Sequence, residues 1–156
     1  MNSDIPCEDR WYEDFSIGES FTLGSVQMNA EEMIDFSTQF DPQRFHIDAE
    51  AAVDTIYGSL IASGWHTGSL MMRLLTDGFL GDSSQGAAGI SEITWPSPVR
   101  PGDTLTLRVE VLSKRVSHSR PDIGLIELSN EMVNQDGDVA MRTVPTMIIA
   151  RREVAT

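Results

Sequence analysis

The chain has 156 residues, enough for one domain with a substantial core, and its hydrophobic fraction of 40% is ordinary for a globular protein. Its net charge of -13 makes nucleic acid a poor partner, because phosphate binding relies on clustered Lys and Arg side chains. With a single cysteine, Cys7, an intramolecular disulfide is impossible and a cysteine-based metal site is not expected.

The first part of the chain predicts a strand followed by a helix. Residues Phe21 to Met28 alternate weakly between apolar and polar side chains, which favours a strand. Asn29 is a candidate helix N-cap with Glu32 three residues later, and apolar residues then recur at helical spacing at Met33, Phe36 and Phe40. Because Pro42 disfavours helical backbone in the residue before it, we expect this helix to end at Asp41.

Two more helices are predicted before the remaining strands. Residues 48–53 predict a short helix with Asp48 near its cap. A longer helix opens near Gly64, and its apolar residues surround the whole circumference: Leu70, Met71, Met72, Leu74, Leu75 and Phe79. A helix that is apolar on all sides is a buried one, so we expect this helix to be buried all round and to end near Gly78 or Gly81.

From Gly86 onward the apolar residues recur with a period of two, as in strands. The clearest strand alternates at Leu105, Leu107, Val109 and Val111. A turn at residues 100–103 separates it from a strand at about Ile90 to Trp95, and a turn at 134–138 separates two later strands, 123–133 and 139–150. We expect consecutive hairpins, with Pro145 at a sheet edge or a bulge.

These elements predict an α+β fold in which a curved antiparallel sheet wraps around one long apolar helix, the hot-dog architecture. We expect a single domain over residues 1–156, with a core at about 15–151 and flexible termini. The chain opens without an apolar leader, and its apolar runs stop well short of the roughly 20 residues that a membrane helix needs. We therefore expect a soluble, intracellular protein with a cytoplasmic location and no membrane partner.

The segment after the first predicted helix could carry chemistry. It places the carboxylate of Asp41 and the imidazole of His46 five residues apart, in a chain that proline forces out of helix. A turn here can point both side chains at one spot, where they would hold and polarise a water molecule. The alternative for the same residues is a helix cap and a surface or hydrogen-bonded histidine.

The start of the long helix is the second such segment. The first N–H groups of a helix lack partners within the helix and lie at the positive end of its dipole. Gly64 has no side chain, so a carbonyl oxygen could approach its N–H and receive a hydrogen bond as negative charge develops. The alternative role of Gly64 is tight packing or an unusual backbone angle.

Together the two segments resemble the MaoC-like hydratase/dehydratase family, which includes the (R)-specific enoyl-CoA hydratases. That family has the pattern Asp-x-Asn-Pro-x-His-x-Asp, and an Ile-x-x-Gly-type segment opens its central helix. The pattern is matched at Asp41, His46 and Asp48, and Gly64 lies where the family places its oxyanion glycine. The segment from Trp95 to Leu105 also looks like the family's Pro-Val…Gly-Asp strand pair, so the resemblance covers about residues 15–151.

The resemblance implies a hydro-lyase that needs no cofactor and no metal. A trans-2-enoyl thioester, of coenzyme A or of an acyl carrier protein, would bind with its carbonyl oxygen on the N–H of Gly64. Asp41 and His46 would position and activate the water that adds at C3, and the reverse reaction would dehydrate a 3-hydroxyacyl thioester. Which of the two takes the proton stays open here. The resemblance also implies a homodimer whose sheets join, or a higher homo-oligomer, with sites near the subunit boundary.

Departures from the family pattern leave two rival functions. Gln43-Arg44 stands where Asn-Pro is common, and Ser63-Gly64-Trp65 stands where many members have His-Gly-Met. Arg44 could pair with Asp41 and lower its pKa, contact a ligand phosphate, or face solvent. Trp65 could narrow the acyl pocket or belong to the core. The rivals are a non-catalytic module that binds acyl thioesters, and a hot-dog thioesterase that directs water at the carbonyl carbon.

The remaining polar residues give weaker signals. His66 follows Gly64 closely but need not face the same site, so it is not a candidate. The basic run from Lys114 to Arg120, which contains His118, could meet the phosphates of a nucleotide-bearing thioester or be a solvated strand end. No cluster has metal-ligand spacing, and no glycine-rich phosphate loop is present in the sequence.

Overall fold

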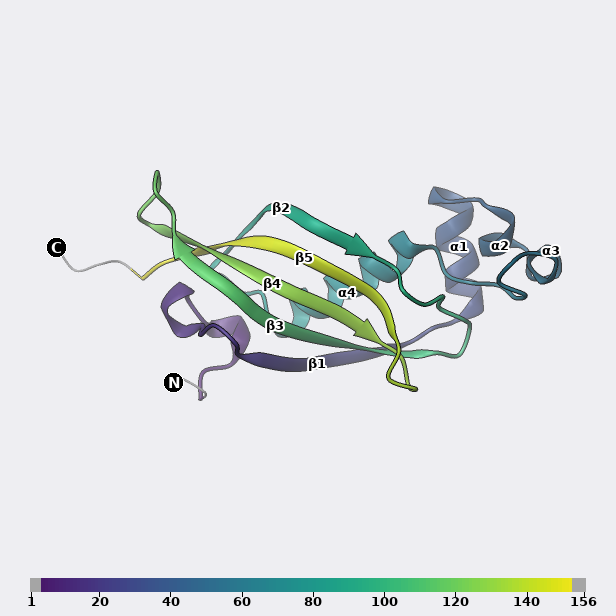
Figure 1. The fold of residues 1–156 in the computed structure, drawn as a ribbon, viewed down its shortest axis with the longest axis horizontal. Coiled ribbons are helices and arrows are strands. Elements are labelled where there is room, and N and C mark those ends of the chain that lie inside the picture. Colours follow the sequence, from purple (N-terminus) through teal and green to yellow (C-terminus); the bar gives the residue numbers. More distant parts are fainter. Residues whose placement is uncertain (1–3, 153–156) are drawn as a thin grey trace.

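The computed structural model describes residues 4–152 as one curved antiparallel sheet with a long helix against it (Figure 1). The strand order is β1-β3-β4-β5-β2. The strands are β1 (Ser20–Gln27), β2 (Ser84–Thr94), β3 (Thr104–Val116), β4 (Ile123–Val133) and β5 (Val139–Ala150). The helices are α1 (Ala30–Phe40), α2 (Arg44–Ile47), α3 (Ala49–Val53) and α4 (Gly64–Gly78), after two 3-10 turns, Cys7–Asp9 and Tyr12–Asp14. The predicted α+β hot-dog fold is confirmed.

The core lies between the sheet and α4. The predicted alternation in β3 is confirmed, because its four apolar side chains are at most 1% exposed: Leu105, Leu107, Val109 and Val111. Met71 and Leu75 of α4 belong to the same buried cluster. Full burial of one such side chain contributes about 1.5–3 kcal/mol, so this contact fixes α4 against the sheet.

Two predicted helix caps are present in the cluster α1–α3, which lies at one end of the sheet (Figure 1). The Asn29 side chain accepts hydrogen bonds from the N–H groups of Glu31 and Glu32 at the start of α1. Asp48 does the same for α3. Helix α1 ends at Phe40, with Asp41 at its C-cap, as Pro42 predicts. The single turn α2 was not predicted.

The prediction of consecutive hairpins is wrong for β2 and β3. Strand β2 pairs with β5, whereas β3 lies between β1 and β4. The connection, residues 95–103, therefore crosses from one edge of the sheet to the other side. The turn at its end is present, with Gly102 at φ 90°, but a turn specifies a local bend and not the strand that pairs next.

The structure also decides between the two predicted positions of Pro145, a sheet edge or a bulge. Strand β5 lies between β4 and β2, so the edge position is wrong. The pairing of β5 with β2 shifts register on both sides of the Ile90–Pro145 pair, which confirms the bulge. Proline has no N–H to donate to the strand ladder, and the irregular pairing at this point accommodates the missing donor.

The prediction that α4 is buried on all sides is wrong for this chain. The sheet covers one side of the helix, where Met71 and Leu75 lie, but Trp65 is 57% exposed and Met72 is 48% exposed. An apolar circumference indicates burial without saying which neighbour provides it. Trp65 and Met72 therefore lie on the exposed side of α4, which they share with polar and charged residues such as Arg73 and Asp77.

Two further expectations concern membrane-spanning helices and the ends of the chain. Within residues 4–152, no helix is long and apolar enough to cross a membrane. The expected flexibility of the chain ends concerns residues 1–3 and 153–156, which lie outside the described residues.

Candidate active site

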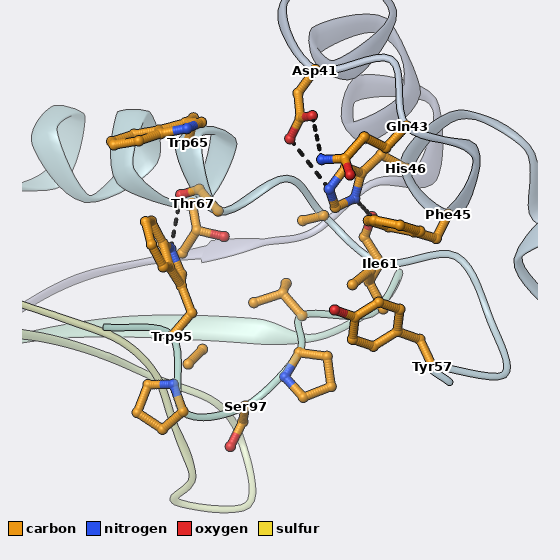
Figure 2. A pocket seen from close by; sticks show the side chains of 16 residues that line it. Asp41, Gln43, Phe45, His46, Tyr57, Ile61, Trp65, Thr67, Trp95 and Ser97 are labelled. Carbon is orange, nitrogen blue, oxygen red and sulfur yellow. Dashed lines mark hydrogen bonds and ion pairs between the residues drawn. The ribbon is translucent and has the colours of Figure 1, made fainter. Parts of the chain in front are cut away.

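A cavity of about 480 Å³ lies where the cluster α1–α3 meets the start of α4. Its lining includes the three predicted site residues Asp41, His46 and Gly64. Figure 2 shows Asp41 and His46 on one side of this cavity and two tryptophans, Trp65 and Trp95, on the other. The structure therefore brings the two predicted segments together around one space.

Local structure explains how Asp41 and His46 meet. Asp41 is the C-cap of α1, and Pro42 and Gln43 then lead the chain into the single turn α2. That turn brings the His46 Nε2 atom to 3.3 Å from the Asp41 Oδ2 atom. His46 is only 5% exposed, so its ring is held within the protein at the edge of the cavity.

The second nitrogen of His46 determines the tautomer. Nδ1 lies 2.8 Å from the carbonyl oxygen of Ile61, and a carbonyl oxygen can only accept a hydrogen bond. Nδ1 therefore carries the proton of the neutral ring and donates it to Ile61. The lone pair of the neutral imidazole is then on Nε2, beside Asp41, where it can accept a proton from water.

Asp41 is held as a carboxylate by its hydrogen-bond donors. The Gln43 amide donates to Oδ1 at 2.7 Å, and the Ser63 hydroxyl donates to Oδ2 at 2.7 Å. Burial raises the pKa of Asp41, but these two hydrogen bonds and the nearby imidazole of His46 outweigh it and lower the pKa below its ordinary value. Asp41 is thus a weak base and a strong hydrogen-bond acceptor at neutral pH.

Ser63 is a site residue that the sequence analysis missed. It is fully buried and is the N-cap of α4, where its hydroxyl accepts a hydrogen bond from the N–H of Trp65 while donating to Asp41. The signal available in the sequence was a serine directly before a helix start, a favoured N-cap. Its bond to Asp41, 22 residues earlier, is a tertiary contact that no local pattern indicates.

Replacing Ser63 with Ala is expected to raise the pKa of Asp41 toward its ordinary value. A lowered folded-state pKa contributes stability above the unfolded-state pKa and loses it as pH falls through the folded value. The stability difference between wild type and Ser63→Ala should therefore be about 1 kcal/mol or more at neutral pH and shrink below about pH 4. NMR titration of the Asp41 carboxyl and urea unfolding at both pH values measure this. Ser119→Ala, at an exposed turn position, is the control.

Gly64 carries the free N–H at the start of α4. The N–H of Trp65 is bonded to the Ser63 hydroxyl, and those of His66 and Thr67 are bonded to the Ser63 carbonyl oxygen. Within residues 4–152 the N–H of Gly64 has no acceptor, and Gly64 lines the cavity. A free N–H at the positive end of a helix can stabilise an oxygen on which negative charge develops.

The absence of a side chain at Gly64 is required by Trp95. A Cβ atom at Gly64 would lie 2.5 Å from two atoms of the Trp95 ring. The ring is held in that position because its Nε1–H donates to the Gly64 carbonyl oxygen at 3.1 Å. Trp65 packs edge-on against the same ring, with ring centroids 5.5 Å apart. Trp65 is therefore a wall of the cavity, and the core alternative is wrong.

The Gly64→Ala variant is expected to displace Trp95 and to lower any activity of this site at least about tenfold, because small misplacements of a reacting geometry are costly. Tryptophan emission should shift at the same time. Gly78→Ala is the matched control, because a Cβ at Gly78 meets Leu23 only at 3.5 Å, an ordinary contact. Full activity with unchanged emission in Gly64→Ala would contradict the clash.

Comparison with known proteins now identifies the family. The family model described as "MaoC like domain" matches residues 14–127. The chain belongs to this family. It is 32% identical over 124 residues to the uncharacterized protein YdeM of Bacillus subtilis (strain 168), which covers 79% of this chain and 86% of YdeM.

Solved structures agree with the family assignment. The MaoC-like dehydratase from Rhodospirillum rubrum superposes with a TM-score of 0.87 at 38% identity, over 93% of this MaoC-like chain and 99% of that one. The unliganded R-hydratase PhaJ1 from Pseudomonas aeruginosa gives a TM-score of 0.73 at 21% identity, over 94% and 92%. The second likeness shows the shared fold.

The structure shows the contacts of Gln43 and Arg44, two residues at which this MaoC-like chain departs from the family pattern. Gln43 keeps a hydrogen bond to Asp41, as its amide allows. Arg44 is exposed and makes no ion pair within the described residues, so pairing with Asp41 is wrong, whereas a contact with a ligand phosphate stays a prediction. The Asp41 pKa is lowered without any contribution from Arg44.

The weaker candidates lie away from the cavity. His66 stacks on Phe36 of α1, with centroids 4.9 Å apart, and does not line the cavity. In the basic run, Lys114 donates to two backbone carbonyl groups and Arg120 pairs with Asp122, at a strand end and turn, and a contact of the run with thioester phosphates stays a prediction. The described part of the chain contains no group of three or more His, Cys, Asp or Glu residues that could hold a metal.

Proposed function

We propose that this MaoC-like chain is a hydro-lyase that reversibly adds water to a 2-enoyl thioester, as an enoyl-CoA hydratase or 3-hydroxyacyl-CoA dehydratase. The observation that supports this most is the shared cavity of three groups: the Nε2 lone pair of His46, the carboxylate of Asp41 and the free N–H of Gly64. An acceptor pair for water and a donor for an oxyanion are what conjugate addition to a thioester requires.

The groups divide the reaction as follows. A water molecule donates one hydrogen to His46 Nε2 and the other to Asp41, which leaves an oxygen lone pair free to attack C3. The π electrons shift toward the thioester carbonyl oxygen, which accepts a hydrogen bond from Gly64. The water proton moves to Nε2, and the imidazolium is stabilised by Asp41 at 3.3 Å. That proton then passes to C2, so one water has been added and both residues are restored.

The lowered pKa of Asp41 supports His46 as the proton acceptor. A carboxylate with two strong donors is a poor base, whereas the neutral imidazole of His46 has a free lone pair. We propose His46 as the general base and Asp41 as the group that orients the water and stabilises the imidazolium. The R. rubrum protein that this chain resembles at 38% identity is itself described as a MaoC-like dehydratase.

The experiment uses crotonyl-CoA with the purified full chain. Loss of the enoyl absorbance without release of free thiol is the expected result. Release of free thiol would overturn the proposal in favour of the thioesterase, since the same N–H of Gly64 could serve a carbonyl under direct attack. Absence of both, with crotonyl-CoA still bound, would favour the non-catalytic module. Crotonyl groups on an acyl carrier protein distinguish the two thioester carriers.

We also propose that a second copy of the chain pairs along β2. This strand is one of the two edges of the sheet, its residues are mostly exposed, and it contains no Lys, Arg or Pro. Its one charge, Glu92, pairs with Arg142 of the neighbouring strand at 2.5 Å. Such an edge is a template for another strand. Sedimentation should give a dimer mass, and Ala88→Lys should weaken it; a monomer for the wild type would contradict the pairing.

A further inference from the structure

A second cleft, of about 430 Å³, lies between α4 and the strands β2 and β5. It extends along α4 from Trp65 to Leu75, a separation of ten positions that rises about 15 Å in a helix. We call it the methionine groove because four methionines line it: Met71, Met72, Met141 and Met147. Flexible thioether side chains of this kind adapt to apolar ligands of different shape.

Trp65 connects the methionine groove to the candidate active site. Among the described residues it is the one that lines both cavities. Its ring is exposed and is held edge-on against Trp95, as Figure 2 shows for the side facing the active site. A chain attached to a thioester carbonyl at Gly64 would therefore have to pass along the Trp65 ring to reach the groove.

One polar side chain stands out in the groove. Asn130 of β4 is 2% exposed, lines the groove, and its Oδ1 atom has no hydrogen-bond partner. The neighbouring Thr143 hydroxyl does not supply one, because it donates to the Met71 sulfur at 3.5 Å. A buried acceptor without a donor is costly, and the groove around it is lined mostly by methionines and other apolar groups.

On the proposed function the acyl chain of the thioester lies in the methionine groove, and we propose that Asn130 selects a chain that carries a hydroxyl group. The placement of the thioester carbonyl at Gly64 rests on the proposed function. A hydroxyl donates to Asn130 Oδ1 and so satisfies it, while a plain alkyl chain leaves the amide unpaired. The rest of the chain lies against the four methionines and the Trp65 ring.

The groove is tested with a saturated thioester, which cannot be hydrated. A leucine at Gly68 fills the groove, because its Cβ would lie 3.2 Å from the movable Met141 methyl group. Gly68→Leu should weaken dodecanoyl-CoA binding at least about tenfold by calorimetry and leave butyryl-CoA binding unchanged. The control Thr76→Leu adds the same side chain on the exposed side of α4. Equal weakening in both variants, or none in Gly68→Leu, overturns the groove as the acyl site.

The hydroxyl is tested with dodecanoyl-CoA isomers that carry one hydroxyl at successive positions along the chain. At least one isomer should bind about fivefold or more tightly than dodecanoyl-CoA, and Asn130→Leu should abolish that advantage without weakening dodecanoyl-CoA. No favoured isomer, or an advantage that persists in Asn130→Leu, overturns the selection. If a second copy of the chain fills the groove, dodecanoyl-CoA binds no more tightly than butyryl-CoA, which also overturns it.

These binding results are independent of turnover. A chain that fails to hydrate crotonyl-CoA but binds hydroxylated dodecanoyl-CoA through Gly68 and Asn130 removes the proposed function and keeps the groove. A chain that hydrates crotonyl-CoA but binds thioesters equally well whatever their acyl length and hydroxylation removes the groove and keeps the proposed function.

Discussion

The His46→Ala variant is expected to hydrate crotonyl-CoA at least about 10²-fold more slowly than the wild type. The reason is that Nε2 carries the only lone pair of the ring, because Nδ1–H is committed to the Ile61 carbonyl. Without the ring, the water keeps the Asp41 carboxylate as an acceptor, but that carboxylate is a poor base. Initial rates at saturating and at low substrate measure the loss in kcat and in kcat/KM.

A rescue experiment separates chemistry from structure in His46→Ala. The substitution also removes the hydrogen bond to Ile61, so part of the loss could come from a shifted loop. Added imidazole should restore part of the rate if the ring acts as a base, and should restore nothing if its role is only structural. His118→Ala, on the exposed turn after β3, is the matched control and should retain full activity.

The Asp41→Asn variant is expected to lose at least about 10²-fold as well, with the fold retained. An Asn side chain offers one oxygen where the carboxylate accepts from Gln43, Ser63 and the water, so one donor loses its partner. The imidazolium of His46 also loses its counter-charge at 3.3 Å, which raises the barrier to proton uptake.

Kinetics and folding are measured together for Asp41→Asn. The rate loss should fall mainly on kcat, because the missing charge matters most when the imidazolium forms. Asp77→Asn, at the exposed end of α4, removes a carboxylate of similar size in an exposed ion pair and is the control. Wild-type turnover in both Asp41→Asn and His46→Ala would remove the site assignment.

Local sequence signals predicted most of the secondary structure. The bounds of β4 and β5 agree residue for residue with the turn signals around them, and the caps Asn29 and Asp48 are where short polar side chains precede apolar helical patterns. These features depend on neighbours in sequence. The partner of β2 could not be found this way, because hydrogen bonding to β5 is decided by the whole sheet.

The same distinction between local and long-range contacts applies to the candidate site. Asp41 and His46 meet through one turn of chain, so their spacing was informative. Ser63 reaches Asp41 across 22 residues, and Trp95 reaches Gly64 across 31, by way of the crossing connection after β2. The unexpected crossing is therefore what places Trp95 in the cavity, and no periodicity in the sequence encodes it.

Water labelled with a heavy oxygen isotope gives the most direct test of the proposed water addition. Crotonyl-CoA is incubated with the full chain in water labelled with a heavy oxygen isotope, and the products are analysed by mass spectrometry. The label should appear at C3 of an intact 3-hydroxybutyryl-CoA, and at least about 10²-fold more slowly with His46→Ala. Label in free crotonate, or unlabelled crotonyl-CoA recovered at high enzyme concentration, would contradict water addition between His46, Asp41 and Gly64.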